Sequence, residues 1–320
     1  MQKVIVAGGA GFIGSHLCKK LIAEGNMVYC LDNYITGSKN NVENLLDNPN
    51  FILLEYDLNQ PLEAIKERFN EVHYIFHLAS PASPNKDSAR SYINHPIETM
   101  LANSVGTYHL LLLAKEKNAK FLFASTSEVY GNPAVSPQPE TYFGNVNPNG
   151  IRAVYDESKR YGEAMTFAFF RKENLDVRII RIFNTYGPFM QKDDGRAVST
   201  FVNQALDGVP ITVFGDGSQT RSFCYVDDMV EGISKAMFTS GTNGQVINLG
   251  NPDERSITEI ATLIKDAVGT NVQIVFKSLP EDDPSKRKPD ITKAKNLLQW
   301  EPKITFEEGL KKTIDYFRHT

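Results

Sequence analysis

Tyr155 and Lys159 form a Tyr-x-x-x-Lys pattern inside an amphipathic stretch at residues 154–173. Residues four apart share one face of a helix, so the lysine ammonium can lie beside the phenol. A neighbouring positive charge favours the phenolate and lowers the pKa of a tyrosine. Such a tyrosine can accept the proton of a hydroxyl group while a hydride leaves the same carbon for a nicotinamide. The pattern is common, however, and taken alone an exposed helical face explains it better.

Three polar residues, Thr126, Ser127 and Glu128, follow the apolar run at residues 121–124. In a parallel sheet, ligands bind outside the carboxyl ends of the strands, which is where these side chains would lie. A hydroxyl group there can bond the oxygen atom that reacts. Residues that merely cap the exit of a strand are the competing interpretation.

A glycine-rich segment at residues 8–14 follows the apolar run Lys3–Ala7 and opens a helix-like stretch. Its glycines fit both G-x-G-x-x-G and G-x-x-G-x-x-G, patterns that let a backbone turn sharply and approach a pyrophosphate. The N–H groups of the following helix would favour the phosphates. Asp32 ends the next apolar run, near the spacing expected for the acid that bonds an adenine ribose. An acid repels a 2′-phosphate, and Asn33 rather than an arginine follows it, so the sequence predicts NAD rather than NADP. For the glycine-rich segment, a purely structural turn is the alternative interpretation.

The elements that must position these residues alternate along the first half of the chain. Short apolar runs read as buried strands of a parallel sheet: Lys3–Ala7, 27–31, 51–54, 73–77, 121–124 and Val177–Ile182. Longer amphipathic stretches lie between them, at 12–24, 96–118 and 154–173. This alternation predicts a doubly wound α/β sheet.

After about Asn184, glycine and proline punctuate shorter elements, with two helices expected at Ile257–Val268 and 306–317. We expect residues 1–183, with later returning segments, to form a dinucleotide-binding domain. Residues 184–320 would form most of a smaller mixed lobe packed on it, with a cleft between the two.

Composition narrows the class of protein. The 320 residues are 41% hydrophobic and 22% charged, with a net charge of −4, which disfavours a disordered chain and a nucleic-acid binder. No apolar stretch is long enough for a membrane span. Three scattered cysteines and no export signal predict a reducing, cytoplasmic location. The absence of His-x-x-x-His and Cys-x-x-Cys pairs predicts no metal site.

The chain resembles the extended short-chain dehydrogenase/reductases that act on nucleotide sugars, over almost its whole length. Within that family it most resembles the UDP-glucuronate decarboxylases. The matching segments are 77–84 (HLASPASP), 125–131 (STSEVYG), 145–148 (NVNP), 155–160 (YDESKR), 181–188 (RIFNTYGP), 219–225 (QTRSFCY) and 287–291 (RKPDI). The resemblance implies a Rossmann-type doubly wound parallel sheet with a smaller mixed α/β substrate-binding lobe.

The resemblance also implies a mechanism. Tyr155, helped by Lys159 and Thr126, would oxidise a UDP-sugar at C4 with NAD. The C4 ketone makes the C6 carboxylate part of a β-keto acid, which loses carbon dioxide readily. Glu128 and Arg287 would serve this step, with a contribution from Ser127, before C4 is reduced again.

Binding residues follow from the resemblance in the same way. The implied cofactor contacts are Gly8, Gly11, Phe12, Ile13, Gly14, Asp32, Asn33, Asp57, Leu58, Leu78, Ser80, Asn103, Tyr155 and Lys159. The implied substrate contacts are Asn184, Arg196, Arg221 and Tyr225, although surface salt bridges and packing also explain the last three. Stretches 96–118 and 154–173 resemble the pair that forms a four-helix homodimer interface, with intramolecular packing as the alternative.

Several related activities are compatible with the same residues. The 4,6-dehydratases carry an acid where this chain has Ser127, and 4-epimerases usually have smaller, uncharged residues where it has Glu128. A longer loop at 85–96, together with Glu98 and Leu101 in place of lysines, leaves room for a different substrate. A 4-epimerase, a 4-keto reductase, a dehydratase, a decarboxylase of an N-acetylated uronate and a non-catalytic NAD-binding sensor or scaffold are the alternatives.

Overall fold

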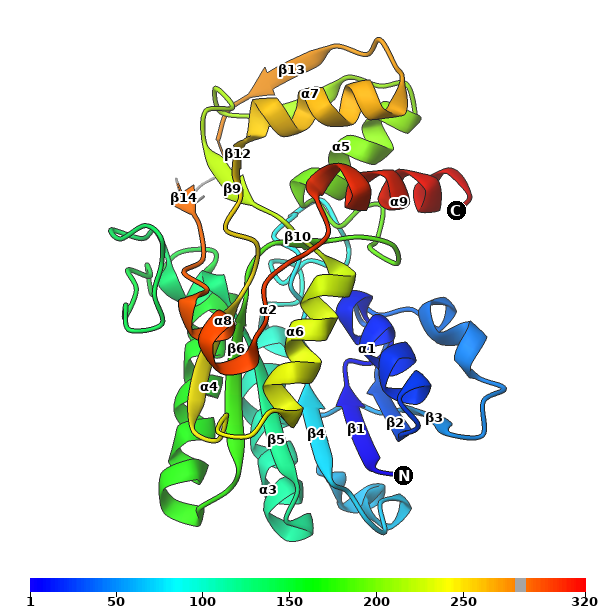
Figure 1. The fold of residues 1–320 in the computed structure, drawn as a ribbon, viewed down its shortest axis with the longest axis vertical. Helices are drawn as coiled ribbons and strands as arrows, with labels where there is room; N and C mark the ends of the chain where they lie inside the picture. The colour runs from blue at the N-terminus through cyan, green and yellow to red at the C-terminus, as the bar shows by residue number, and fades with distance from the viewer. Residues whose placement is uncertain (280–285) are drawn as a thin grey trace.

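The computed structural model describes residues 1–279 and 286–320. Its largest sheet has seven strands, all parallel, in the order β11-β6-β5-β4-β1-β2-β3 (Figure 1). The strands are β1 (Lys3–Ala7), β2 (Met27–Asp32), β3 (Phe51–Glu55), β4 (Tyr74–His77), β5 (Lys120–Thr126), β6 (Val177–Ile182) and β11 (Gln245–Leu249). The strand order reverses at β1, between β4 and β2, which is the point where open α/β sheets bind ligands.

Both faces of this sheet are buried, which explains the continuous apolar runs of the sequence. On β1, Val4 and Val6 belong to one hydrophobic core. Ile5 and Ala7 belong to a second core on the opposite face. Helices α1 (Phe12–Ala23) and α6 (Val226–Phe238) cover the first face, and α3 (Thr107–Lys117) and α4 (Ala153–Glu173) cover the second. Successive strand residues alternate between faces, so a strand covered on both sides has no solvent side on which to place polar residues.

The stretch at 96–118 forms two helices instead of the single one that its pattern predicts. Helix α2 (Pro96–Leu101) and α3 are joined by a π-helical turn, η4 (Ala102–Gly106). The turn directs the Asn103 amide inward, where it donates to the hydroxyls of Ser80 and Ser158. Single π-helical turns are frequent at functional sites because they reorient one side chain without ending the helix.

Beyond β6 the elements are short and mixed, as the glycine and proline punctuation predicts. They are β7 (Thr185–Tyr186), α5 (Ala197–Leu206), β8 (Ile211–Phe214), β9 (Thr220–Ser222), β10 (Cys224–Tyr225), β12 (Glu254–Ser256), α7 (Ile257–Val268), β13 (Ile274–Lys277), β14 (Lys286–Arg287), α8 (Thr292–Leu298) and α9 (Phe306–Arg318). Figure 1 shows α5, α7, α9 and β13 gathered beyond one end of the main sheet. The chain returns to that sheet through α6 and β11, and α8 packs on β11.

Four short 3-10 turns complete the described secondary structure: η1 (Lys39–Leu45), η2 (Leu62–Ala64), η3 (Lys66–Arg68) and η5 (Ser127–Tyr130). The last of them places the polar residues after β5 in a tight turn, with the Thr126 hydroxyl accepting the main-chain N–H of Glu128. Among the described helices, none has the length and apolar character that crossing a bilayer requires.

Candidate active site

A cleft of about 910 Å³ runs along the carboxyl ends of the parallel strands, between the main sheet and the second group of elements. It is lined by residues from both, so the loops after β1, β2, β4 and β5 meet the segment that leads into α5. The cleft holds all but two of the expected site residues: Gly8, Gly11, Phe12, Ile13, Gly14, Asp32, Asn33, Asp57, Leu58, Leu78, Ser80, Thr126, Ser127, Glu128, Tyr155, Lys159, Asn184, Arg196, Arg221 and Arg287.

Asn103 and Tyr225 are the two expected contacts outside the lining. Asn103 is fully buried behind Ser80, and its side-chain oxygen has no partner among the described residues. Tyr225 is buried against Tyr186, with the Lys312 ammonium 5.2 Å from the centre of its ring. Tyr225 therefore packs against its neighbours and does not line the cleft. Asn103 lies behind the cleft wall, where it bonds Ser80.

The glycine-rich turn between β1 and α1 is closely packed main chain. Gly8 has a φ of +78°, and a Cβ atom there would lie 2.6 Å from the main-chain nitrogen of Ala79. A Cβ atom on Gly14 would lie 2.1 Å from the carbonyl oxygen of Gly8. The first turn of α1 contains no acidic residue, so its positive end faces the cleft uncompensated. This geometry fits a phosphate group in contact with bare backbone.

Asp32 lies at the end of β2, beside this turn. Its carboxylate oxygens accept the main-chain N–H groups of Ala10 and Tyr34, each at 2.9 Å. Burial raises the pKa of the carboxyl group, although these two bonds oppose the shift. A Cβ atom on Gly37 would lie 2.8 Å from one of these oxygens, so the loop has room only for hydrogen at that point. The arrangement presents a fixed acceptor, which suits the hydroxyls of an adenine ribose.

Tyr155 and Lys159 face the cleft from the first turns of α4, and both are buried. The Lys159 ammonium donates to the carbonyl of Ala124 at 2.8 Å, and burial lowers the pKa of this lysine to about 7. The pKa of Tyr155 is raised to about 12, first by burial, which outweighs the opposing hydrogen bond with Thr126. The sequence predicts a lowered pKa for this tyrosine, and the structure shows the opposite direction because burial dominates. Burial destabilises both charged forms at once.

Glu128 lies between two guanidinium groups. One of its oxygens is 2.6 Å from Arg287 and the other is 2.5 Å from Arg152. Arg287 is 2% exposed and also donates to the Ser127 hydroxyl at 3.1 Å. Burial alone would raise the pKa of Glu128, but the charges of Arg152 and Arg287 outweigh it and hold the pKa well below its usual range. The three groups carry one net positive charge next to Tyr155.

Sequence reasoning missed three residues of this cluster. Arg152 precedes α4 and contacts Glu128, and no spacing in the sequence distinguishes it from a surface arginine. Tyr92 comes from the long loop after β4 and stacks on Tyr155, with ring centres 5.0 Å apart and planes 4° from parallel. Asp156, inside the Tyr-Lys motif, is buried; burial, then the charge of Glu128, raise its pKa to about 8.

The opposite wall of the cleft carries the expected substrate arginines. Arg196 forms a two-pronged ion pair with Asp194, at 2.5 and 2.7 Å. Arg221 on β9 lies in register with Arg287 on the parallel neighbour β14. The pairing brings the two arginines together, although they are far apart in the sequence. The guanidinium groups of Arg221 and Arg287, both from this small sheet, thus line the cleft together. This arrangement suits an anionic ligand.

The loop at 85–96 lines the cleft and is tied across it. Ser88 donates to a carboxylate oxygen of Asp193 at 2.9 Å, and Arg90 donates to the side chain of Gln191 at 2.5 Å. The Ser83 hydroxyl donates to the Asp194 carbonyl just before the loop begins. The loop therefore borders the ligand space and helps to hold the segment that presents Arg196.

Comparisons with known proteins agree with this geometry. The model of a family described as the NAD dependent epimerase/dehydratase family matches residues 4–250. UDP-glucuronic acid decarboxylase 1 of Xenopus tropicalis is 50% identical over 99% of this chain and 72% of its own length. UDP-glucuronic acid decarboxylase 5 of Arabidopsis thaliana is 47% identical over 99% of this chain and 89% of its own.

Solved structures of related enzymes have the same fold. A UDP-glucuronic acid 4-epimerase from Bacillus cereus, in complex with UDP-glucuronic acid and NAD, is 28% identical with a TM-score of 0.88. A UDP-glucose 4-epimerase from Thermotoga maritima, with UDP-glucose, is 32% identical with a TM-score of 0.90. Each comparison covers 99% of both chains.

The ion cluster predicts a pH-dependent contribution to stability. The pKa of Glu128 is lower in the folded protein, at about 2, than the value of about 4.3 expected in the unfolded chain. Its carboxylate therefore stabilises the fold above about pH 4.3, and this contribution is lost as the pH falls towards 2. Glu128→Gln should lower the free energy of unfolding by about 3 kcal/mol at pH 7, and by less at pH 3.5.

Urea unfolding of both proteins at the two pH values measures this difference. Glu157→Gln is the matched control, because Glu157 forms a half-exposed ion pair with Arg160; it should change the free energy by less than about 1 kcal/mol. An equal loss for Glu128→Gln at both pH values would contradict the ion-pair account.

Proposed function

The chain belongs to the NAD-dependent epimerase/dehydratase family, and we propose that it converts UDP-glucuronate to UDP-xylose with NAD as cofactor. The observation that carries the proposal is the half-buried Glu128 between Arg152 and Arg287, beside Tyr155. The similarity to UDP-glucuronic acid decarboxylases over 99% of the chain supports the same conclusion.

The cleft fits NAD at the end where the glycine-rich turn lies. The turn between Gly8 and Gly14 is packed so closely that neither glycine has room for a side chain. Its bare backbone can therefore approach the pyrophosphate of NAD. Asp32 is held in place to accept from the hydroxyls of the adenine ribose. NAD held there would supply a hydride acceptor for C4 of the sugar and a hydride donor for the final reduction, so the overall reaction would consume no oxidant.

Tyr155 acts on the proton of the C4 hydroxyl group. Its phenol is hydrogen-bonded to Thr126, which can hold the same sugar oxygen. A pKa of about 12 is too high for a base at neutral pH, so Tyr155 needs a nearby positive charge to release its proton. Lys159, with a pKa of about 7, can take up a proton and supply the nearby positive charge that stabilises the phenolate.

The arginines act on the carboxylate. With a ketone at C4, the bond between C5 and C6 breaks and its electron pair passes into an enolate that ends on the C4 oxygen. Carbon dioxide leaves, and a proton supplied by a neighbouring side chain or by water is added at C5. Arg287, with the net positive charge of its cluster, offsets the charge of the substrate carboxylate and of the enolate. Glu128, with Ser127 beside it, keeps the guanidinium oriented.

Proton NMR of the protein with UDP-glucuronate and NAD tests this function. We expect the signals of a UDP-pentose with the coupling constants of xylose. Glu128→Gln should lower carbon dioxide release at least tenfold while the absorbance of reduced cofactor still forms in a single turnover. Tyr155→Phe should abolish both, because the C4 proton then has no acceptor.

Two conservative changes outside the cleft, Glu157→Gln and Tyr161→Phe, serve as controls and should leave both signals unchanged. Conversion to UDP-galacturonate would identify a 4-epimerase instead. No reaction with UDP-glucuronate, followed by turnover of an N-acetylated uronate, would show that the loop at 85–96 selects another sugar.

The cofactor preference rests on Asp32. Its carboxylate should repel a 2′-phosphate, so we expect NAD to bind at least tenfold more tightly than NADP in a calorimetric titration. Asp32→Asn keeps an acceptor oxygen and removes the charge, and should narrow this ratio. Asp47→Asn, an exposed change, is the control. Equal affinities in the unchanged protein would overturn the assignment of NAD.

We also propose a homodimer whose interface is a four-helix bundle of α2–α3 and α4 from each copy. These helices pack on one another and present a face of exposed large apolar side chains: Ile97, Met100, Leu101, Tyr108, Leu112 and Tyr161. Such a face on a folded protein is typical of an interaction surface.

Leu112→Glu should shift the protein from dimer to monomer in sedimentation equilibrium, because a charge would be buried at the interface. Phe143→Glu changes the most exposed aromatic residue, at 88%, which lies outside these helices. It should leave the mass unchanged. If the protein without substitutions sediments as a monomer, the proposed dimer is refuted.

Two further assignments complete the proposal. Residues 1–183 with the returning segments form the NAD-binding domain, and most of 184–320 forms the lobe that binds the nucleotide sugar. Cys18, Cys30 and Cys224 are buried free thiols, which supports a cytoplasmic location in a reducing environment. Fractionation of the source cells tests the location.

A further inference from the structure

Arg287 lies on a very short strand. Strand β14 has only two residues, and it pairs with β9 at the edge of a small sheet. The Nε atom of Arg287 is buried and has no hydrogen-bond partner among the described residues. The guanidinium bonds Glu128, Ser127 and the carbonyl of Gly131 through its terminal nitrogens, so whether it reaches them depends on where the backbone of this short strand is held.

Gln138 holds that backbone on the side after Arg287. Its main-chain N–H donates to the carbonyl of Lys288 at 2.8 Å, and its own carbonyl accepts the N–H of Asp290 at 3.0 Å. Its side-chain oxygen accepts the N–H of Lys288 at 2.8 Å, and its side-chain nitrogen donates to Val135 at 2.7 Å. Gln138 is fully buried, so water cannot replace these bonds.

Asn248 locks the same contact from the end of β11. Its side-chain nitrogen donates to the carbonyls of Gln138 at 2.9 Å and Asp290 at 3.2 Å. Its side-chain oxygen accepts the Tyr130 hydroxyl at 2.8 Å, and it too is fully buried. The Asn248 amide thus joins the loop of Gln138, the segment after Arg287 and the turn η5.

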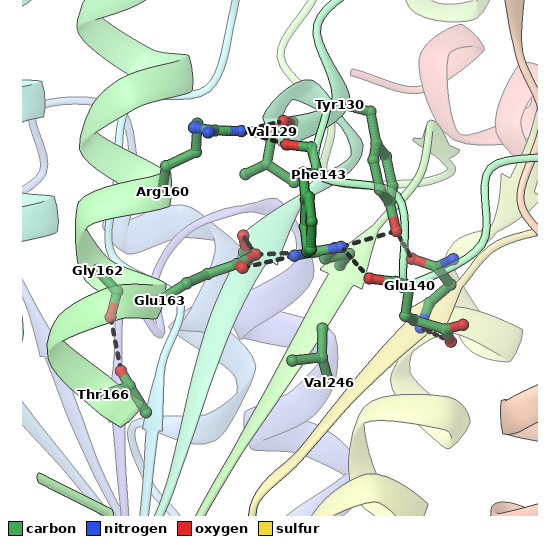
Figure 2. A network of polar contacts seen from close by, with 12 residues as sticks. Val129, Tyr130, Glu140, Phe143, Arg160, Gly162, Glu163, Thr166 and Val246 are labelled. Atoms are coloured by element: carbon green, nitrogen blue, oxygen red, sulfur yellow. Dashed lines mark hydrogen bonds and ion pairs between the residues drawn. The ribbon is translucent and has the colours of Figure 1, made fainter. Parts of the chain in front are cut away.

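The network continues to the catalytic turn. Arg181 donates to the Tyr130 hydroxyl at 3.0 Å and forms a two-pronged pair with Glu163 at 2.9 and 2.7 Å. Figure 2 shows Tyr130, Glu140 and Glu163 meeting from η5, the loop after it and α4. Each of the three accepts a hydrogen bond from Arg181. Tyr130 ends the turn that contains Glu128. One hydrogen-bond network therefore holds both the turn that carries Glu128 and the segment that follows Arg287.

We propose that Gln138 and Asn248 are positioning residues that set the register of Arg287 against Glu128. The inference rests on the proposed role of Arg287 in the loss of carbon dioxide. Neither amide lines the cleft, so both act through the backbone of residues 288–290. Without them, the guanidinium moves away from the reacting carboxylate while the C4 chemistry of Tyr155 keeps its geometry.

Gln138→Met and Asn248→Leu test this inference, since each keeps the volume and removes the side-chain hydrogen bonds. We expect carbon dioxide release to fall at least tenfold in kcat, with little change in KM. Single-turnover formation of reduced cofactor should stay within about threefold of the unchanged protein, and UDP-4-keto-hexuronate should accumulate. Since both side chains act on one segment, the double variant should lose no more than the worse single variant.

Asn26→Leu is the matched control. Asn26 is a buried amide that donates to the carbonyl of Leu21 before β2, at the opposite end of the sheet. It should leave the ratio of the two signals unchanged, whatever it does to stability. A parallel loss of both signals in Gln138→Met and Asn248→Leu would reduce these residues to a general structural role and overturn the inference.

Arg287→Lys separates this inference from the function on which it rests. If Arg287→Lys releases carbon dioxide at the normal rate, the proposed role of Arg287 fails. If Arg287→Lys loses that step while Gln138→Met and Asn248→Leu keep it, the positioning inference alone fails.

Discussion

The placement of Glu128 between Arg152 and Arg287 is the constraint on which the rest of the site depends. Removing a charged group from water costs several kcal/mol unless partners of opposite charge replace the water. Each oxygen of Glu128 has such a partner. The three groups come from η5, from the residue before α4 and from β14. These elements therefore have to meet closely, and the buried amides of Gln138 and Asn248 bond the end of η5 and the segment that follows β14.

The parallel sheet determines where this meeting takes place. Parallel strands all end at the same edge, so the loops after β1, β2, β4 and β5 share one cleft. The same topology explains why the polar residues lie at strand ends, because helices cover both faces of the sheet. The second group of elements closes the cleft from the other side with Arg196 and Arg221. The glycine-rich turn and the group of Glu128 and Arg152 thus lie on the side of the main sheet, and Arg196 and Arg221 face them across the cleft.

Burial controls the protonation of the site more than any single neighbour does. It raises the pKa of Tyr155 to about 12 and lowers that of Lys159 to about 7, so burial opposes the charged form of both groups. Glu128 escapes this effect only because two guanidinium groups compensate it. Buried Asp156, without a guanidinium bond of its own among the described contacts, shows the opposite result with a pKa of about 8. Similar carboxyl groups in one cluster are therefore kept in different states by their partners.

Spacing along the chain predicts the features that act within one element or one turn. The glycine-rich turn, Asp32, the residues after β5 and the pair of Tyr155 and Lys159 were all predicted, because their spacing along the chain fixes their geometry. Arg287 came from a family resemblance, since no spacing links it to Ser127, 160 residues away. Arg152, Tyr92, Gln138 and Asn248 became evident only in the tertiary structure. Their roles depend on contacts between distant segments and on burial, which removes competing water and thereby decides both the pKa values and the strength of each hydrogen bond.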